Sequence, residues 1–253
     1  MPTITVLTPV VYGKHHYLLE AYESLKRQEL PPGWDWQWVV QEDGQTGILN
    51  DILPSDPRIS TGCSHQGRAS TARTLGLARA EGELLRAFDA DDILPEGALE
   101  QDIKALISSP EFGWCVSPTL DLMPDGSLVP GPCDPDPGPL PPGLLYEGQA
   151  AGNLPVVGTT MCTYTSLVRA LGGWPAIFAD EDVALMLAVE AVAQGVMLAE
   201  PGLYYRKWPG ATTAQVTDYQ PAEGHTRTAA ILSRADALRE LGWRWNGCPA
   251  GTK

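Results

Sequence analysis

The chain has 253 residues, 43% of them hydrophobic, and a formal net charge of −14. This length is enough for one large α/β domain, or for two small ones, with a sizeable core. The negative charge argues against a sequence-independent nucleic-acid binder, because such proteins hold phosphates with clustered lysine and arginine.

Other features of the sequence indicate the cellular compartment of the protein. The sequence has no run of about 18 apolar residues, so we expect no membrane span, and residues 1–4 lack the basic stretch of a signal peptide. The cysteines are odd in number and show no CxxC spacing, which favours reduced thiols over a zinc site or a disulfide framework. They are Cys63, Cys115, Cys133, Cys162 and Cys248. We therefore expect a cytoplasmic protein.

Predicted strands and helices alternate along the first 110 residues. Apolar, β-rich runs predict strands, and apolar residues at helical spacing predict helices. The predicted strands cover residues 3–8, 36–41, 58–63 and 83–88, and the predicted helices cover 15–28, 67–80 and 95–108. This alternation is typical of an α/β fold with a mainly parallel, doubly wound sheet.

The pattern changes after Pro110. Residues 130–143 are rich in proline and glycine, which predicts an irregular, exposed loop beside the site, and residues 124–127 predict a turn. The predicted strands here cover 113–118, 156–164, 196–198 and 203–205, and the predicted helices cover 165–171, 180–194 and 221–241.

The strand predicted at residues 83–88 runs directly into three carboxylates. Asp89 and Asp91 lie one residue apart, a spacing that can hold a divalent cation, which in turn binds substrate phosphates. The plainer interpretation is a chance Asp-x-Asp sequence in which Asp92 and Pro95 only open the next helix.

Short motifs follow one another along residues 3–210. They are Thr8-Pro9-Val10; Glu42-Asp43-Gly44; Gly67 to Arg73 followed by Ala80 to Glu83; Asp89-Ala90-Asp91-Asp92; Gly172-Gly173-Trp174 followed by Glu181-Asp182 and Leu185; and Tyr205-Arg206. Each motif is weak alone, but in this order they resemble the family 2 glycosyltransferases. The resemblance implies the GT-A fold, a Rossmann-like, mainly parallel sheet with an added acceptor-side region.

The resemblance also implies an activity. It is the inverting transfer of a sugar from a nucleotide diphosphate, UDP first and TDP next, to a hydroxyl or amine of a soluble acceptor such as a small natural product. Mn²⁺ or Mg²⁺, bound through Asp91 with Asp89 nearby, would neutralise the leaving diphosphate.

The resemblance places a nucleotide site on the first half of the chain. Asp43 would accept a hydrogen bond from the base, and Arg68 would lie near the base or the phosphates. The full predicted set is Thr8, Pro9, Val10, Tyr12, Asp43, Arg68 and Ala90. Alternatively, Asp43 is an ordinary turn residue and Arg68 is a solvated residue in the first turn of a helix.

The acceptor side depends on residues 174–206. Asp182 would be the general base that takes the acceptor's proton, with Glu181 as its rival; alternatively, these acids serve only the helix dipole. Trp174 would be either a platform for the acceptor or a buried core residue. Arg206 and Asp92 would contact the sugars.

The chain departs from the family at several positions, one of which is Thr74, where the family usually has an asparagine after Arg73. The histidine that often follows the Tyr-Arg pair is absent, so either the metal has fewer protein ligands or His225 reaches it. Arg206 or Lys207 would then stabilise the diphosphate directly. Residues 11–14, with Gly13-Lys14, stand where the first motif usually has an asparagine.

We expect one domain over residues 1–253, with a nucleotide-sugar half at 1–110, an acceptor half at 111–215, and a C-terminal helix and tail at 216–253. One alternative function is a non-catalytic binder of sugar nucleotides or glycans. A sugar-1-phosphate nucleotidyltransferase is disfavoured, because residues 8–12 lack its glycine-rich loop. A phosphatase with an Asp-x-Asp nucleophile is disfavoured because that pair would follow the first strand.

Overall fold

The structure, a computed structural model, describes residues 1–131, 134–208 and 221–247. The strands of its main sheet are β1 (Thr3–Val11), β2 (Asp35–Asp43), β3 (Ile59–Ser64), β4 (Leu84–Ala87), β5 (Phe112–Val116), β8 (Gly138–Pro139), β9 (Cys162–Tyr164) and β10 (Gln194–Met197). A smaller sheet contains β6 (Thr119–Leu122), β7 (Leu128–Pro130) and β11 (Leu203–Arg206).

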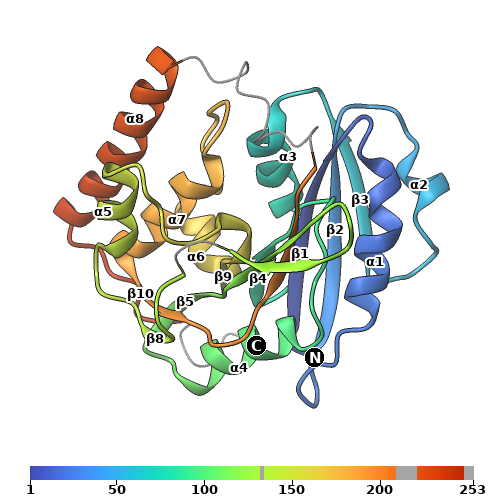
Figure 1. Cartoon of the computed structure of the whole chain (residues 1–253), viewed down its shortest axis with the longest axis horizontal. Helices are drawn as coiled ribbons and strands as arrows, with labels where there is room; N and C mark the ends of the chain where they lie inside the picture. The colour runs from blue at the N-terminus through green and yellow to red at the C-terminus, as the bar shows by residue number, and fades with distance from the viewer. Residues whose placement is uncertain (132–133, 209–220, 248–253) are drawn as a thin grey trace.

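The helices are α1 (Leu18–Lys26), α2 (Leu49–Ile52), α3 (Arg68–Leu77), α4 (Ala98–Ser108), α5 (Leu144–Ala150), α6 (Thr165–Ala170), α7 (Glu181–Val192) and α8 (Pro221–Glu240). Two short 3₁₀ helices, η1 (His15–Tyr17) and η2 (Gly158–Thr160), precede α1 and β9. Helix α8 packs along α7 and α5 at one side of the molecule (Figure 1). In the described residues, none of the helices is long and apolar enough to cross a membrane.

The order of the main sheet sets the place of the site. The strands lie in the order β3-β2-β1-β4-β9-β5-β10-β8, and β1 is parallel to both β2 and β4. From β1 the chain builds outward to β2 and β3 on one side, and it returns to β4 on the other (Figure 1). Such a reversal of strand order opens a crevice outside the carboxyl ends of the two strands. The ends of β1 and β4 therefore frame the candidate site.

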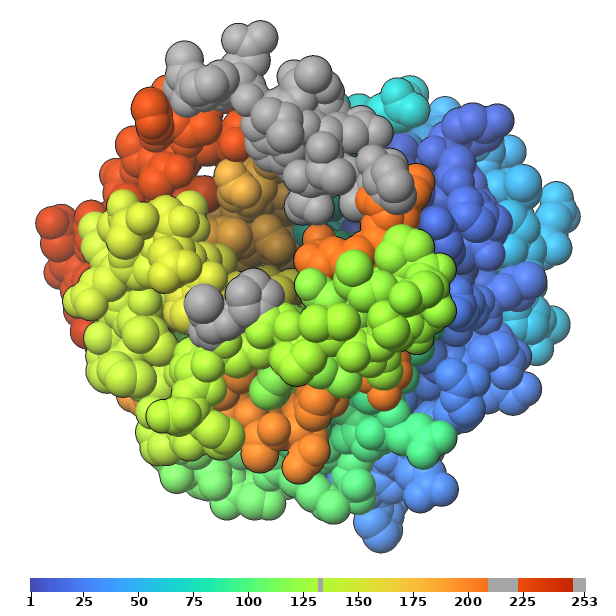
Figure 2. Space-filling model, in the orientation of Figure 1, coloured from blue at the N-terminus to red at the C-terminus, as the bar shows by residue number. Residues whose placement is uncertain are grey.

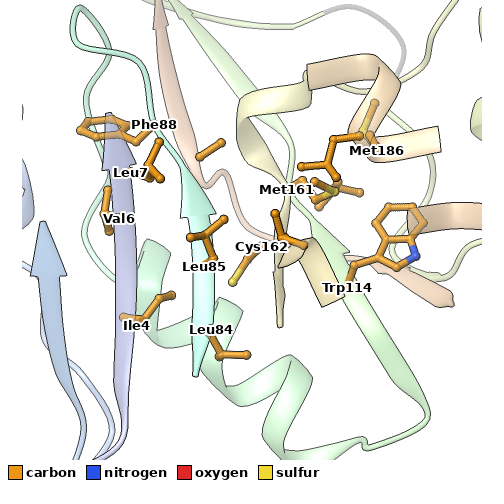
Figure 3. Close-up of a cluster of buried hydrophobic side chains, with 14 of the residues drawn as sticks. Ile4, Val6, Leu7, Leu84, Leu85, Phe88, Trp114, Met161, Cys162 and Met186 are labelled. Carbon is orange, nitrogen blue, oxygen red and sulfur yellow. The ribbon is translucent and has the colours of Figure 1, made fainter. Parts of the chain in front are cut away.

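The core extends from this crevice across the sheet to α7 (Figure 3). Burial of these apolar side chains is the main force that holds the layers together. The buried side chains labelled in Figure 3 are Ile4, Val6, Leu7, Leu84, Leu85, Phe88, Trp114, Met161, Cys162 and Met186.

Most of the predicted elements are present, and the mainly parallel α/β sheet is confirmed. The strand predicted at 156–164 is wrong over its first part, where η2 replaces it. Gly158 explains the difference, because a Cβ there would lie 2.5 Å from Asp182 Oδ2. The chain makes this close approach as a tight turn, and only Cys162–Tyr164 forms a strand, antiparallel to β4 and β5.

The sequence patterns missed several short elements around the predicted turn at 124–127. That turn joins β6 to β7 as a hairpin, and α5 follows the proline-rich segment. The described part of 130–143 is irregular apart from the end of β7 and the two residues of β8; residues 132 and 133 lie outside the described residues.

A buried ion pair joins β4 to α4. Arg86 and Asp102 are both fully buried and form a direct hydrogen bond. The second guanidinium nitrogen of Arg86 donates to the carbonyl of Gly202 at 2.7 Å, so the same side chain also fixes the approach to β11. Burial is the largest influence on the carboxyl of Asp102 and raises its pKa, while Arg86 opposes this.

We predict that Arg86→Met costs about 3–5 kcal/mol in the free energy of unfolding, because it leaves a buried carboxylate without its partner. Urea denaturation measures the loss. The control is Lys104→Met, which breaks an exposed pair with Glu100 and should cost about 0.3–0.5 kcal/mol. Equal effects of the two substitutions would contradict the assigned role of Arg86.

Candidate functional site

The turn after β4 carries the three predicted carboxylates. Asp89 accepts a hydrogen bond from Arg73 at 2.6 Å. Asp91 Oδ2 lies 2.8 Å from Lys14 Nζ and 3.3 Å from Trp208 Nε1. Elements from the start, the middle and the end of the chain therefore converge on this turn.

Asp92 and Arg206 hold β11 against the turn. Asp92 is 3% exposed, and its Oδ1 accepts the backbone N–H of Arg206 at 3.0 Å. Arg206 Nε donates to the carbonyl of Asp91 at 2.6 Å, and its guanidinium also binds Glu20. The carboxyl of Asp92 is buried and holds the backbone of β11, and its contact with a sugar remains a prediction. Arg206 positions the motif through the contacts that it makes here.

The loop before α3 is tied to the end of β2. Asp43, 5% exposed, accepts backbone N–H groups from Gly67 at 2.6 Å and from Arg68 at 3.1 Å. Arg68 has a φ of +67°, a left-handed conformation that costs free energy in a residue other than glycine. Its exposed guanidinium lies 3.9 Å from the centre of the Phe178 ring. Asp43 therefore anchors a strained loop; its contact with a base remains a prediction.

The burial of three predicted nucleotide residues corrects the prediction for their side chains. Thr8 is fully buried and accepts a hydrogen bond from Trp38 Nε1 at 2.9 Å. Val10 and Ala90 are core residues. Their side chains pack the end of the sheet and do not line a pocket. Pro9 is half-buried, and Tyr12 is 75% exposed.

Arg73 links the turn after β4 to the start of α7. One guanidinium nitrogen binds Asp89, and the other forms an ion pair with Glu181. Burial raises the pKa of Glu181 to about 7, although Arg73 opposes the shift. Burial likewise raises the pKa of Asp89; Arg73 opposes this, while Asp91 and Asp182 add to it. Asp182 thus lies close enough to Asp89 to act on it electrostatically.

Asp182 is the more available of the two candidate bases. It is half-buried, with Oδ1 on the backbone N–H of Val183 at 2.9 Å and Oδ2 beside Gly158. Glu181, in contrast, is held by Arg73. Figure 2 shows that this face of the molecule is hollowed over α7, between α8 and the β6–β7 hairpin.

Trp174 belongs to the core. It is 3% exposed, and its carbonyl accepts a hydrogen bond from Thr74 Oγ1 at 3.0 Å. The buried alternative is correct for this tryptophan, and the acceptor-platform alternative is wrong.

Asp89 and Asp91 are the candidate ligands for a metal at this turn. In the residues that the structure describes, no three His, Cys, Asp or Glu side chains form a closed metal group, and His225 is exposed on α8. Asp92 Oδ2, however, is buried without a hydrogen-bond partner among the described atoms. Burial and the neighbouring Asp89 raise the pKa of Asp92 well above its usual range. Asp89 and Asp91 supply only two carboxylates, so a cation held here would need further oxygen ligands, such as those of a phosphate.

Sequence reasoning missed Lys14 as a site residue. In the sequence Lys14 is only part of a departure from the family's first motif, because its partner, Asp91, lies 77 residues further along the chain. The other basic candidate, Lys207, points elsewhere and pairs with Asp121 at 3.2 Å.

A cavity of about 660 Å³ lies apart from these residues, between α5, the end of α7 and α8. Its lining includes Tyr146, Glu190, Arg239 and Trp245, but none of the predicted site residues. We place the functional site at the ends of β1 and β4, because that is where the strand order reverses and the carboxylates converge.

Part of the chain is similar to known glycosyltransferases. The family model described as Glycosyl transferase family 2 matches residues 6–121. An uncharacterized glycosyltransferase of Haemophilus influenzae is 28% identical over 115 residues, which are 43% of this chain and 44% of that protein. The chain thus matches less than half the length of that relative.

Solved structures share the fold. The crystal structure of S. aureus TarS 1-349 in complex with UDP-GlcNAc superposes with a TM-score of 0.68 at 18% identity, covering 95% of this chain and 74% of that one. The complex of the same protein with UDP gives 0.66 at 17% identity, covering 94% and 70%. At this level of identity the likeness establishes the fold, which is that of the GT-A glycosyltransferases.

We predict that Asp43→Ala lowers the free energy of unfolding by about 2–4 kcal/mol, because two backbone donors lose a charged acceptor. Chemical denaturation measures this loss. Asp51→Ala, at an exposed position of α2, is the control and should stay within about 0.5 kcal/mol of wild type. A stable Asp43→Ala protein would show that the loop before α3 needs no anchor.

The raised pKa of Glu181 predicts a pH-dependent stability. Between its usual value of 4.5 and about 7, the folded chain keeps a proton that the unfolded chain releases. The free energy of unfolding therefore falls as pH rises through this window. Glu181→Gln removes this contribution, so its stability should change less between pH 5 and pH 8, by about 1 kcal/mol or more. Glu147→Gln, exposed on α5, should keep the wild-type profile; an unchanged profile in Glu181→Gln would refute the assignment.

Proposed function

We propose that this protein transfers a sugar from a nucleotide diphosphate to an acceptor hydroxyl or amine, because residues 6–121 match the family 2 glycosyltransferase model and the described chain has the GT-A fold. The observation that carries this proposal is the convergence of Asp89 and Asp91 at the carboxyl end of β4, beside the end of β1. A crevice at this point of an α/β sheet is where nucleotides bind.

UDP is the first donor nucleotide that we propose, and TDP is the second. The similar TarS structures contain UDP-GlcNAc and UDP, which supports a uridine nucleotide here. We propose that the base of the nucleotide contacts Pro9 and Tyr12, near the carboxyl end of β1, and Asp43, at the end of β2. Arg68, exposed at the start of α3, is the residue that we propose near the base or the phosphates.

The reaction needs a group that stabilises the leaving diphosphate. Mn²⁺ or Mg²⁺, held by Asp91 and Asp89, would supply positive charge for this step. Arg73 holds the carboxylate of Asp89 by a hydrogen bond, and Arg206 donates a hydrogen bond to the backbone carbonyl of Asp91. These two arginines are positioning residues in our proposal.

The acceptor is activated from the other side. Its oxygen or nitrogen attacks the anomeric carbon, and the bond from that carbon to the diphosphate oxygen breaks with its electron pair. Asp182 takes the proton of the acceptor as the new bond forms. Attack on the face opposite the leaving group inverts the configuration at the anomeric carbon.

In this proposal, donor binding and acceptor binding belong to different parts of the chain. We propose that residues 1–110 bind the donor, that residues 111–215 carry the acceptor side, and that residues 216–253 form a C-terminal part, of which the structure describes residues 221–247 with helix α8. The hollow over α7 (Figure 2) supports access of a soluble acceptor to Asp182. The alternative is a binder of sugar nucleotides without turnover, which would have no use for a carboxylate at this position.

We predict that Asp182→Asn lowers the rate of UDP release from a UDP-sugar, in the presence of an acceptor mixture, by about 10²–10⁴-fold, because the general base is lost. Its affinity for UDP should remain within about twofold of wild type, since the carboxylate faces the acceptor. A coupled assay of UDP release and calorimetric titration of UDP measure the two effects.

Asp180→Asn is the matched control. Asp180 lies two residues away, binds Arg227 at 3.1 Å and has a φ of +61°, a conformation that asparagine tolerates. This variant should retain activity. Full activity in Asp182→Asn would refute the mechanism, and tight UDP binding with no turnover in wild type would favour the non-catalytic alternative.

A further inference from the structure

The basic side chains around the turn after β4 have different interaction partners. Arg73 is buried between two carboxylates, and Arg206 binds a backbone carbonyl and Glu20. Arg68 lies on the Phe178 ring, and Lys207 pairs with Asp121 outside the turn. Lys14 differs from these four, because its ammonium lies directly on Asp91.

A tight turn after β1 sets the position of Lys14. Gly13 has a φ of +92°, which glycine adopts at little cost. The backbone N–H of Lys14 then donates to the carbonyl of Val11 at 3.1 Å. This reversal keeps Lys14 above the carboxyl end of β1, across the crevice from β4.

The contact of Lys14 is partly open to solvent. The side chain of Lys14 is 21% exposed and that of Asp91 is 12% exposed. Trp208 lies beside both: its Nε1 donates to the same oxygen of Asp91, and its ring centre is 5.7 Å from Lys14 Nζ. A lysine ammonium is a point charge on a flexible four-carbon stem, so it can turn from Asp91 to a ligand in the crevice.

The negative charge around the crevice opposes the binding of an anionic ligand, so a positively charged side chain is needed there. Asp89 and Asp91 lie on one turn, and Asp182 is close enough to act on Asp89 electrostatically. Arg73 neutralises part of this charge from below but is buried. A diphosphate that enters brings further negative charge and would be repelled by the carboxylates at a few ångströms. A cation on the open side of the turn offsets that repulsion.

We propose that Lys14 is a diphosphate-binding residue, which transfers its ammonium from Asp91 to the phosphate oxygens of the bound nucleotide. The chain then binds a nucleoside diphosphate measurably even when no divalent cation is present. This inference rests on the proposed function, because it assigns a ligand to the same crevice, and it names a residue that the family's motifs do not.

The test is calorimetric titration of UDP and TDP into the full chain in EDTA. Wild type should bind at least one of the two, and Lys14→Met should weaken that binding about tenfold or more, since a charge-assisted hydrogen bond is lost. Lys14→Arg keeps the charge and should stay within about threefold of wild type. Lys26→Met, at an exposed position at the end of α1, should bind as wild type does.

Two further measurements make the outcomes separable. Thermal melting without nucleotide checks that each variant is folded, and the titrations are repeated with Mn²⁺. If wild type binds UDP or TDP with Mn²⁺ but not in EDTA, or if Lys14→Met binds as tightly as wild type in EDTA, Lys14 does not have this role and the proposed function stands. A loss with Lys207→Met in place of Lys14→Met would also overturn the inference. If wild type binds neither nucleotide under either condition, the proposed function itself fails.

Discussion

The ion pairs of Arg73 are the interaction on which the rest of the site depends. This arginine, 3% exposed in the middle of α3, binds Asp89 after β4 and Glu181 at the start of α7. The turn after β4 and the start of α7 are thus fixed relative to each other by one buried cation. Loss of one member of such a network leaves a buried charge uncompensated, which is strongly destabilising. The position of α3 is itself fixed at its start, where Asp43 holds Gly67 and Arg68.

Because Arg73 is buried, the carboxylates of the site have a fixed positive charge on their buried side only. The lower side of the carboxylate cluster faces a fixed guanidinium, while the open side faces Lys14 and solvent. Asp92 and Asp89 both have raised pKa values, with burial as the largest cause. A site of this kind attracts cations and tolerates an anionic ligand only when positive charge accompanies it. The geometry therefore brings the two candidate metal ligands, Asp89 and Asp91, together with a lysine on their open side.

The sequence predicted the frame of the fold well because its signals are local. The apolar strand that ends at Asp89 and the helix that begins at Arg68 each follow from a few neighbouring residues, and both are present. The strand predicted from Val156 was wrong, because the close packing of Gly158 against Asp182 is a long-range contact that an apolar run does not reveal. The β6–β7 hairpin was missed because both strands are short and partly exposed.

The site residues divide in the same way. The motif order singled out Asp89, Asp91 and Asp182, but it could not tell a ligand-facing side chain from one used for packing. Thr8 and Trp174 carry motif positions and are buried, since whether a side chain faces the crevice depends on the strands and helices that cover it. Lys14 contacts Asp91 only because the turn at Gly13 brings β1 and β4 together at their ends. That contact becomes visible only in three dimensions.

The most direct test of the donor site is a crystal structure of the chain with UDP and Mn²⁺. We expect the diphosphate at the carboxyl ends of β1 and β4, against Asp91 and Lys14, with the base on the side of Asp43. A nucleotide bound instead in the cavity lined by Tyr146, Glu190 and Arg239 would contradict it, because the crevice between β1 and β4 would then not be the donor site.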